Sequence, residues 1–149
     1  ITQQGTNQNY VKYYGDGSFN DVTISQTGNG STQSNYVDLT LTGNSNTVDL
    51  TQSSTGGGKG IFATISDNDN NVSVTQSGSG SHYLNLNLSG GNKTVDVTQT
   101  GSANHMADIN LSGAGARSLN LTQQGSTQQF YGISTCASSC QSITVTQGQ

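Results

Sequence analysis

The stretch Thr94-Val95-Asp96-Val97-Thr98-Gln99-Thr100-Gly101 decides the fold, because its pattern recurs along the whole chain. The pattern is apolar-x-apolar-x-Gln, and in most copies a Gly follows two residues after the Gln. The repeated residue stands at Gln3, Gln26, Gln52, Gln76, Gln99, Gln123 and Gln147, with steps of 23, 26, 24, 23, 24 and 24 residues. A period in this range is typical of a solenoid, in which each repeat packs only on its neighbours.

Each period also holds a second short apolar segment, which is clearest at Val37/Leu39/Leu41 and at Leu84/Leu86/Leu88. Alternation with period two and many β-branched residues predict a strand for both kinds of segment. Gly-rich and Asn-rich stretches such as Gly43-Asn44 and Gly78-Ser79-Gly80 lie between them and predict tight turns. We therefore expect an all-β fold. It would be a β-solenoid of about six stacked strand-turn-strand-turn repeats, forming one domain over residues 1–149.

The composition favours stacked polar ladders over disorder. Only 29% of the residues are hydrophobic, but charged residues are also rare at 8%, and there is no Pro. Disordered chains usually combine low hydrophobicity with high net charge and Pro. A chain that is rich in Gly, Asn, Gln, Ser and Thr and nearly uncharged can instead hydrogen-bond identical side chains in register.

The basic residues, Lys12, Lys59, Lys93 and Arg117, are scattered along the sequence. They form no basic patch that could neutralise phosphates, so we expect no nucleic-acid partner. No apolar run is long enough to span a bilayer, so we expect no membrane insertion. The chain opens inside a repeat, at Ile1-Thr2-Gln3-Gln4-Gly5, which predicts a mature or trimmed form whose targeting segment is missing.

Stacking the repeats at roughly 4.8 Å would align equivalent residues in columns. The Gln column points inward, where each amide is expected to hydrogen-bond to the Gln above and below, which offsets its desolvation. One outward column is almost entirely hydroxyl: Ser25, Thr51, Thr75, Thr98, Thr122 and Thr146. In the other outward column, Thr23, Asp49, Ser73, Asp96, Asn120 and Thr144, no two Asp are adjacent, which avoids like-charge repulsion.

Neither end of the repeat array carries a polar cap. The first half-repeat offers Ile1 and Gln3, and the last offers Ile143, Val145 and Gln147. Solenoids that remain monomeric need capping repeats. We therefore expect the C-terminal repeat of one copy to template the N-terminal repeat of the next, giving a head-to-tail homopolymer, a filament.

The repeats resemble those of the curlin family, the subunits of curli fibres in bacterial biofilms, whose pattern is roughly Ser-x5-Gln-x-Gly-x2-Asn-x5-Gln. The segments 70–78 and 93–104 match its first half, while the leading Ser is replaced by Asn20, Asn46, Asn70, Lys93, Arg117 and Gln141. The resemblance implies a functional amyloid fibre subunit that is secreted, assembles outside the cell and serves in cell adhesion and biofilm matrix. It also implies a nucleator subunit and a secretion pore as partners.

Two further pairs of residues stand out. In a secreted chain, Cys136 and Cys140 are expected to form a disulfide; free thiols or half of a metal site are the alternatives. His82 and His105 are one repeat apart, so we expect them to stack at one corner as surface residues, with metal bridging or pH sensing as alternatives.

Two other functions compete with a fibre. An ice-binding solenoid needs a flat Thr-x-Thr face, and only Thr144/Thr146 gives a full match. Carbohydrate binding by exposed Tyr and Asn is a further alternative. The aromatic residues could either pack on the sheet or form contacts between neighbouring fibres. An enzyme is disfavoured, because the chain has no Glu and its Asp residues are spread out. We therefore expect no catalytic residue, metal or cofactor.

Overall fold

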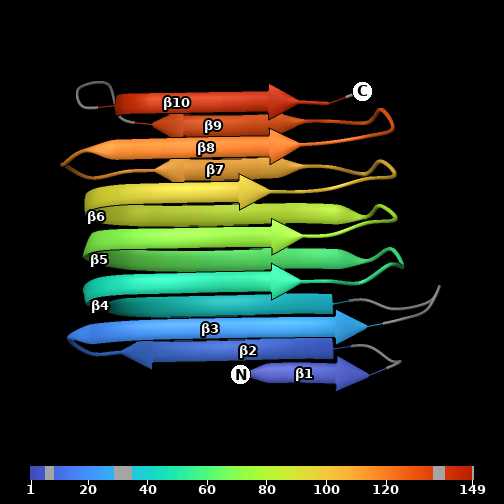
Figure 1. Cartoon of the computed structure of the whole chain (residues 1–149). Coiled ribbons are helices and arrows are strands. Elements are labelled where there is room, and N and C mark those ends of the chain that lie inside the picture. Colours follow the sequence, from blue (N-terminus) through green and yellow to red (C-terminus); the bar gives the residue numbers. More distant parts are fainter. Residues whose placement is uncertain (6–8, 29–34, 136–139, 149) are drawn as a thin grey trace.

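The computed structural model describes residues 1–5, 9–28, 35–135 and 140–148, which form ten strands of one parallel sheet and no helix. The sheet is wound into a β-solenoid, which confirms the predicted fold class (Figure 1). Because the described part has no helix, none of it forms a helical membrane span. The strands are β1 (Thr2–Gly5), β2 (Asn9–Asp16), β3 (Phe19–Gly28), β4 (Asn35–Gln52), β5 (Lys59–Gln76), β6 (His82–Thr98), β7 (Ala107–Leu111), β8 (Arg117–Gln123), β9 (Tyr131–Thr135) and β10 (Cys140–Gln147).

The coils stack into two layers, as Figure 1 shows. The Gln layer consists of β1, β3, the second halves of β4, β5 and β6, then β8 and β10. The second layer consists of β2, the first halves of β4, β5 and β6, then β7 and β9. The two chain termini lie at opposite ends of the stack.

The corner after the second-layer segment differs between coils. In β4 and β5 the chain changes layer at this corner without interrupting its strand pairing, so each is a single strand of 18 residues that pairs on both sides of the corner, for example Ser45 with Asp69. The sequence predicted a turn there. In a later coil the same corner separates β7 from β8, and Gly113 and Gly115 have φ values of 90° and 91°. In the middle coils, pairing to the adjacent coil continues on both sides of the change of layer.

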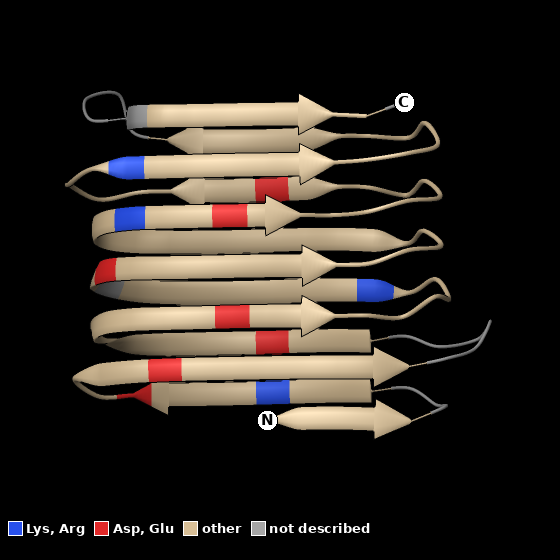
Figure 2. Ribbon diagram, viewed as in Figure 1, with Lys and Arg blue, Asp and Glu red and all other residues tan. Residues whose placement is uncertain are grey.

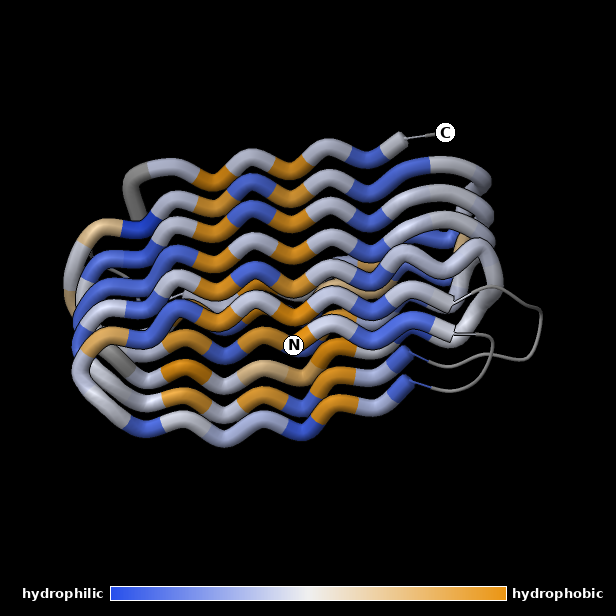
Figure 3. The backbone as a smooth tube through the Cα atoms, turned by 60° about the horizontal axis from the view of Figure 1, so that its bottom comes forward, coloured by the Kyte–Doolittle hydropathy of each residue, from blue (hydrophilic) through white to orange (hydrophobic). Residues whose placement is uncertain are grey.

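The core lies between the layers and runs the length of the stack, as the continuous orange columns in Figure 3 show. Every second residue of each strand points into it, and Ile24, Leu50 and Ile109 are fully buried. This confirms the inward residues that the alternation predicted. Each coil alone presents only one thin row of apolar side chains, so burial comes from stacking.

The corner after the Gln residue is a tight, stacked turn. Ser79, Gly80 and Ser81 have φ values of 60°, 73° and 55°, and the next coil repeats this conformation at Ser102 and Ala103, with 69° and 67°. A Cβ atom on Gly80 would lie 2.5 Å from the carbonyl oxygen of Ser102. The position therefore requires Gly for the close approach of the coil above, whereas its positive φ is also adopted by Ser79 and Ser81.

Candidate functional site: ladders, corners and open ends

The repeated Gln residues lie in one column, in register. Gln3 pairs with Gln26, Gln26 with Gln52 and Gln52 with Gln76, and at the other end Gln123 pairs with Gln147. The five members from Gln26 to Gln123 are completely buried, while Gln3 is half-buried and Gln147 is exposed. The column thus reaches both ends of the stack.

The Gln amides make two kinds of hydrogen bond. The side-chain amide of Gln76 donates to Gln99 Oε1 at 2.9 Å, and that of Gln99 donates to Gln123 Oε1 at 2.8 Å. The same amide also crosses the turn to a second-layer carbonyl in both halves of the stack, as in Gln52 Nε2 to Gly60 O and Gln76 Nε2 to Tyr83 O, each at 3.2 Å. The expected amide-to-amide ladder therefore lies in the C-terminal half. The cross-turn bonds, which the sequence did not predict, join the two layers.

Three of the four basic residues are buried in the corners. Lys59, Lys93 and Arg117 are each at most 2% exposed. Lys59 Nζ donates to the carbonyl oxygens of Gly56, Gly78 and Gly80 at 2.6, 2.8 and 3.3 Å. Burial lowers the pKa of Lys59 to about 8. The Lys59 ammonium group is thus held by hydrogen bonds to backbone carbonyls of a Gly-rich corner.

Lys93 and Arg117 follow the same principle at the opposite corner. Lys93 Nζ donates to Gly90 O at 2.8 Å and to Gly91 O at 2.6 Å, and Arg117 donates to Gly113 O. A positive side chain here supplies hydrogen-bond donors to carbonyls that a buried apolar residue would leave unpaired. The buried cations thus stabilise the corners by hydrogen-bonding to the inward-facing backbone carbonyls.

These residues belong to two polar columns, one at each corner. The first, which we call the His column, contains Asn9, Asn35, Lys59, His82 and His105. The second, which we call the Lys column, contains Asn20, Asn46, Asn70, Lys93 and Arg117. Each member stands two residues before the first inward-facing apolar residue of its segment. Extending the period-two alternation by one step would therefore have predicted these inward side chains.

His82 and His105 stack within the His column. Their rings lie 5.0 Å apart and 2° from parallel. The stacking prediction is confirmed, but the expected surface position is wrong, because both side chains are 2% exposed. His82 Nδ1 contacts Ala103 O at 3.3 Å and His105 Nδ1 contacts Gln128 O at 3.1 Å, while the Nε2 atoms face the carbonyls of Ser77 and Thr100.

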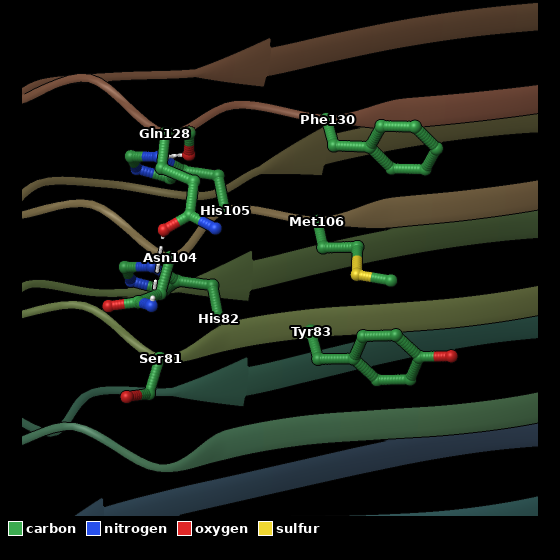
Figure 4. A pocket seen from close by; sticks show the side chains of 8 residues that line it. All are labelled: Ser81, His82, Tyr83, Asn104, His105, Met106, Gln128 and Phe130. Atoms are coloured by element: carbon green, nitrogen blue, oxygen red, sulfur yellow. Dashed lines mark hydrogen bonds between the residues drawn. The ribbon is translucent and has the colours of Figure 1, made fainter.

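Burial lowers the pKa of His82 to about 4, and the positive charge of Lys59 in the coil below acts in the same direction. The Ser77 and Ala103 carbonyls oppose this shift by favouring the protonated ring. Beside the pair, a shallow hollow of about 350 Å³ opens toward Tyr83, Met106 and Phe130, which point the same way one above another (Figure 4). No group of three His, Cys, Asp or Glu that could hold a metal occurs among the described residues.

An aromatic ladder follows the outer side of the second layer. Tyr10 and Tyr36 stack at 5.3 Å, Tyr36 and Phe62 lie 5.2 Å apart, and Phe62 and Tyr83 lie 5.0 Å apart. The rings of Tyr10 and Tyr36 are nearly parallel, at 8°, and the other two pairs are tilted by 36° and 44°, so each ring packs on its neighbour along the stack. This favours the sheet-packing interpretation, since a sugar ring would need a free aromatic face.

Most positive side chains are buried, whereas the described acidic side chains lie at the surface. Of the Asp side chains that the structure describes, none is buried. Lys12 is the one base outside the corners, and it lies 3.6 Å from Asp38. Figure 2 shows most acidic positions within strands and most basic positions beside the corners. The formal charge of -4 therefore understates how acidic the surface is.

The two ends of the stack carry most of the exposed apolar side chains. Ile1, Tyr10, Tyr14, Phe19, Phe130, Tyr131 and Ile143 lie in the terminal coils, and among the described residues only Met106 adds a large exposed apolar side chain elsewhere. The outer edges of β1 and β2 at one end, and of β9 and β10 at the other, have no partner strand in the described part of the chain. The predicted assembly residues Ile1, Gln3, Ile143, Val145 and Gln147 all lie at these two ends.

The predicted disulfide lies outside the described residues. Cys140 begins β10, where its backbone pairs with Arg117, but Cys136 falls in the segment 136–139 that the structure does not describe.

Comparison with known proteins gives no relative: no family model, no curated protein and no solved structure matches this chain. Function has to be argued from the geometry.

Proposed function

We propose that this chain is a structural subunit that polymerises end to end into an extracellular, amyloid-like fibre. The observation that carries the proposal is the pair of free strand edges that share one register. Gln3 on β1 and Gln147 on β10 belong to the same Gln column, at opposite ends. A free parallel edge accepts a strand from another chain. Because the two ends are different surfaces, their association is heterologous and gives an open filament.

The distribution of apolar and acidic residues supports growth at the ends. Exposed Phe19 and Ile143 lie in terminal coils, whereas Asp49 and Asp96 face solvent on the flank of the Gln layer. Acidic flanks repel one another at neutral pH and disfavour side-by-side association. Apolar ends gain free energy when another copy covers them.

The resemblance of the repeats to curlin sequences supports the cellular part of the proposal. On this basis the chain is a curli-like, secreted protein of the cell surface, and its fibre contributes to adhesion and biofilm matrix. A nucleator subunit and a secretion pore are its proposed accessory partners, and no catalytic activity is assigned to it.

Electron microscopy and fibre diffraction of the purified chain in plain buffer test the proposal. We expect thin unbranched fibres that bind an amyloid dye and give a reflection along the fibre axis at about 4.8 Å. A chain that stays a soluble monomer at high concentration would contradict the proposal.

Matched variants of the last strand make the test specific. Val145 of β10 is half-buried and pairs with buried Leu121, while the next residue, Thr146, is exposed. Val145→Lys places a charge inside the junction and should abolish growth, since burying an unpaired charge is costly. Thr146→Lys should grow normally, and removing residues 142–149 should slow or abolish assembly.

A monomeric ice-binding solenoid is the second candidate, and the hydroxyl column favours it. Thr51, Thr75, Thr98 and Thr122 lie in register on the outer side of the Gln layer. The neighbouring column is interrupted by Asp49 and Asp96. Thermal hysteresis from a monomeric sample would favour this candidate, and fibres without hysteresis would exclude it.

A further inference from the structure

The two layers do not end together, and this determines how a second copy can join. The first and last described strands, β1 and β10, both belong to the Gln layer. Since successive segments alternate between layers, the Gln layer has one strand more than the second layer among the described residues. If the next copy continues the second layer by setting its β2 on β9, only one strand position remains between β8 and the β3 of that next copy. The β10 of the first copy and the β1 of the next both compete for it.

The two competing strands differ in length and in what they bury. β1 pairs with β3 at four positions, from Thr2–Ser25 to Gly5–Gly28, and none of its side chains is buried. β10 pairs with β8 from Ser142–Ser118 to Gln147–Gln123. It therefore offers a longer ladder and two inward apolar side chains, Ile143 and Val145, whereas β1 has none and only Ile1 precedes it.

The register of β10 also matches the edge of β3. Ile143 and Val145 continue the columns of Leu119 and Leu121, which in β3 are occupied by Val22 and Ile24. Gln147 would then meet the Gln26 of the next copy and continue the Gln column. β10 can thus take the place of β1 beneath β3 without any change of register.

The second layer closes over the same junction. With β2 of the next copy set on β9, Tyr131 and Ile133 would continue the inward columns of Val11 and Tyr13. The Tyr13 ring packs closely over Gly15, where a Cβ atom would lie only 2.8 Å from it. The half-exposed apolar residues of β9 would be covered by this arrangement.

We propose that the subunits join by strand replacement: each added copy releases its own β1 and accepts β10 of the preceding copy against its β3. The inference rests on the proposed end-to-end polymerisation and specifies its partner surface. It assigns β1 the role of a temporary cover on the β3 edge, held until another copy arrives.

A disulfide that holds β1 in place tests the proposal. Thr2 and Ser25 are paired on the outer side of the Gln layer, and neighbouring parallel strands at about 4.8 Å lie within the range that a disulfide bridges. In a background of Cys136→Ser and Cys140→Ser, the variant Thr2→Cys/Ser25→Cys should elongate seeds at least about tenfold more slowly when oxidised, because the β3 edge stays occupied. Reduction should restore the rate.

The control is a bridge in the same column of the middle coils, Thr75→Cys/Thr98→Cys, which should elongate equally well oxidised and reduced. Unimpaired growth of the oxidised Thr2→Cys/Ser25→Cys chain would overturn strand replacement and leave the fibre proposal intact. If the chain without cysteines and both reduced variants form no fibres, the proposed function fails together with this inference.

Mixed fibres identify the new neighbour directly. Copies with Thr146→Cys and copies with Ser25→Cys, assembled together and oxidised, should give a cross-linked dimer. Cross-linking of Thr146→Cys to Thr2→Cys instead would show that β1 stays bound and that copies stack on it, which contradicts the proposal.

Discussion

The middle coils and the terminal coils carry the same repeat, but they bury it to different degrees. Leu41 and Leu50 in β4 are completely buried, whereas Tyr131 in β9 is 45% exposed and Ile143 in β10 is 42% exposed. The difference lies in the neighbours: a middle coil is covered on both sides and a terminal coil on one. In such a stack, stability is a sum of contacts between adjacent coils, so the ends are where binding energy remains available.

The largest expected effect is in the core, where one column contains both kinds of coil. Leu86→Ala in β6 should lower the free energy of unfolding by about 3 kcal/mol, because the side chain is fully buried between Ala63 and Ile109. Ile133→Ala in β9 should lower it by only about 1 kcal/mol in the monomer. Denaturant unfolding of the two variants measures this contrast, and equal losses would contradict it.

The buried cations sharpen the contrast between corner and surface. Lys59→Met should lower the free energy of unfolding by about 2 kcal/mol, since three carbonyls lose their donor. Lys12→Met should change it by less than about 0.5 kcal/mol, because its pairing with Asp38 is exposed. Lys59→Asn should fall between them, since Asn35 occupies the same column one coil below. Equal effects of Lys59→Met and Lys12→Met on the free energy of unfolding would show that the hydrogen bonds from Lys59 to the three carbonyls do not stabilise the fold.

The Gln column allows a comparison along the stack. Gln99→Ala removes hydrogen bonds to both Gln76 and Gln123 and should lower the free energy of unfolding by about 1.5 kcal/mol. Gln3→Ala removes one exposed bond to Tyr10 O and should lower it by less than about 0.5 kcal/mol. Thermal melting of both variants checks this, and a neutral Gln99→Ala would show that the amide ladder contributes nothing.

The smallest effect is the pH response of His82. The folded-state pKa of His82 is lowered from 6.5 to about 4, so the unfolded chain binds the proton more tightly. Stability that is present above pH 6.5 should therefore fall as the pH drops from 6.5 toward 4. Allowing for solvent at the adjoining hollow, the loss between pH 7 and pH 5 is about 1 kcal/mol.

His82→Asn is the matched control for this response, because Asn35 already stands in the same column. The variant should show a much smaller difference between thermal melting at pH 7 and at pH 5. An unchanged pH response in His82→Asn would assign the effect to other groups.

The period-two alternation and the fixed spacing of Gln were enough to predict the solenoid, its inward apolar residues and the Gln column. The buried positions of Lys59, Lys93 and Arg117 were not predicted, because basic residues are usually exposed. Their burial depends on backbone carbonyls that only the folded corners bring together. The uninterrupted strand pairing around Gly43 was missed for a related reason: the chain changes layer there as predicted, but pairing to the adjacent coil continues across the corner, which local turn propensity does not reveal.

Hydrogen exchange of the backbone amides before and after assembly tests the central claim most directly. The account predicts that amides of the terminal strands, within 9–16 and 131–135, exchange rapidly in the monomer and become protected in the fibre. Amides of the middle coils should be protected in both. If the terminal strands exchange equally fast before and after assembly, the coils do not join through their open ends and the account is contradicted.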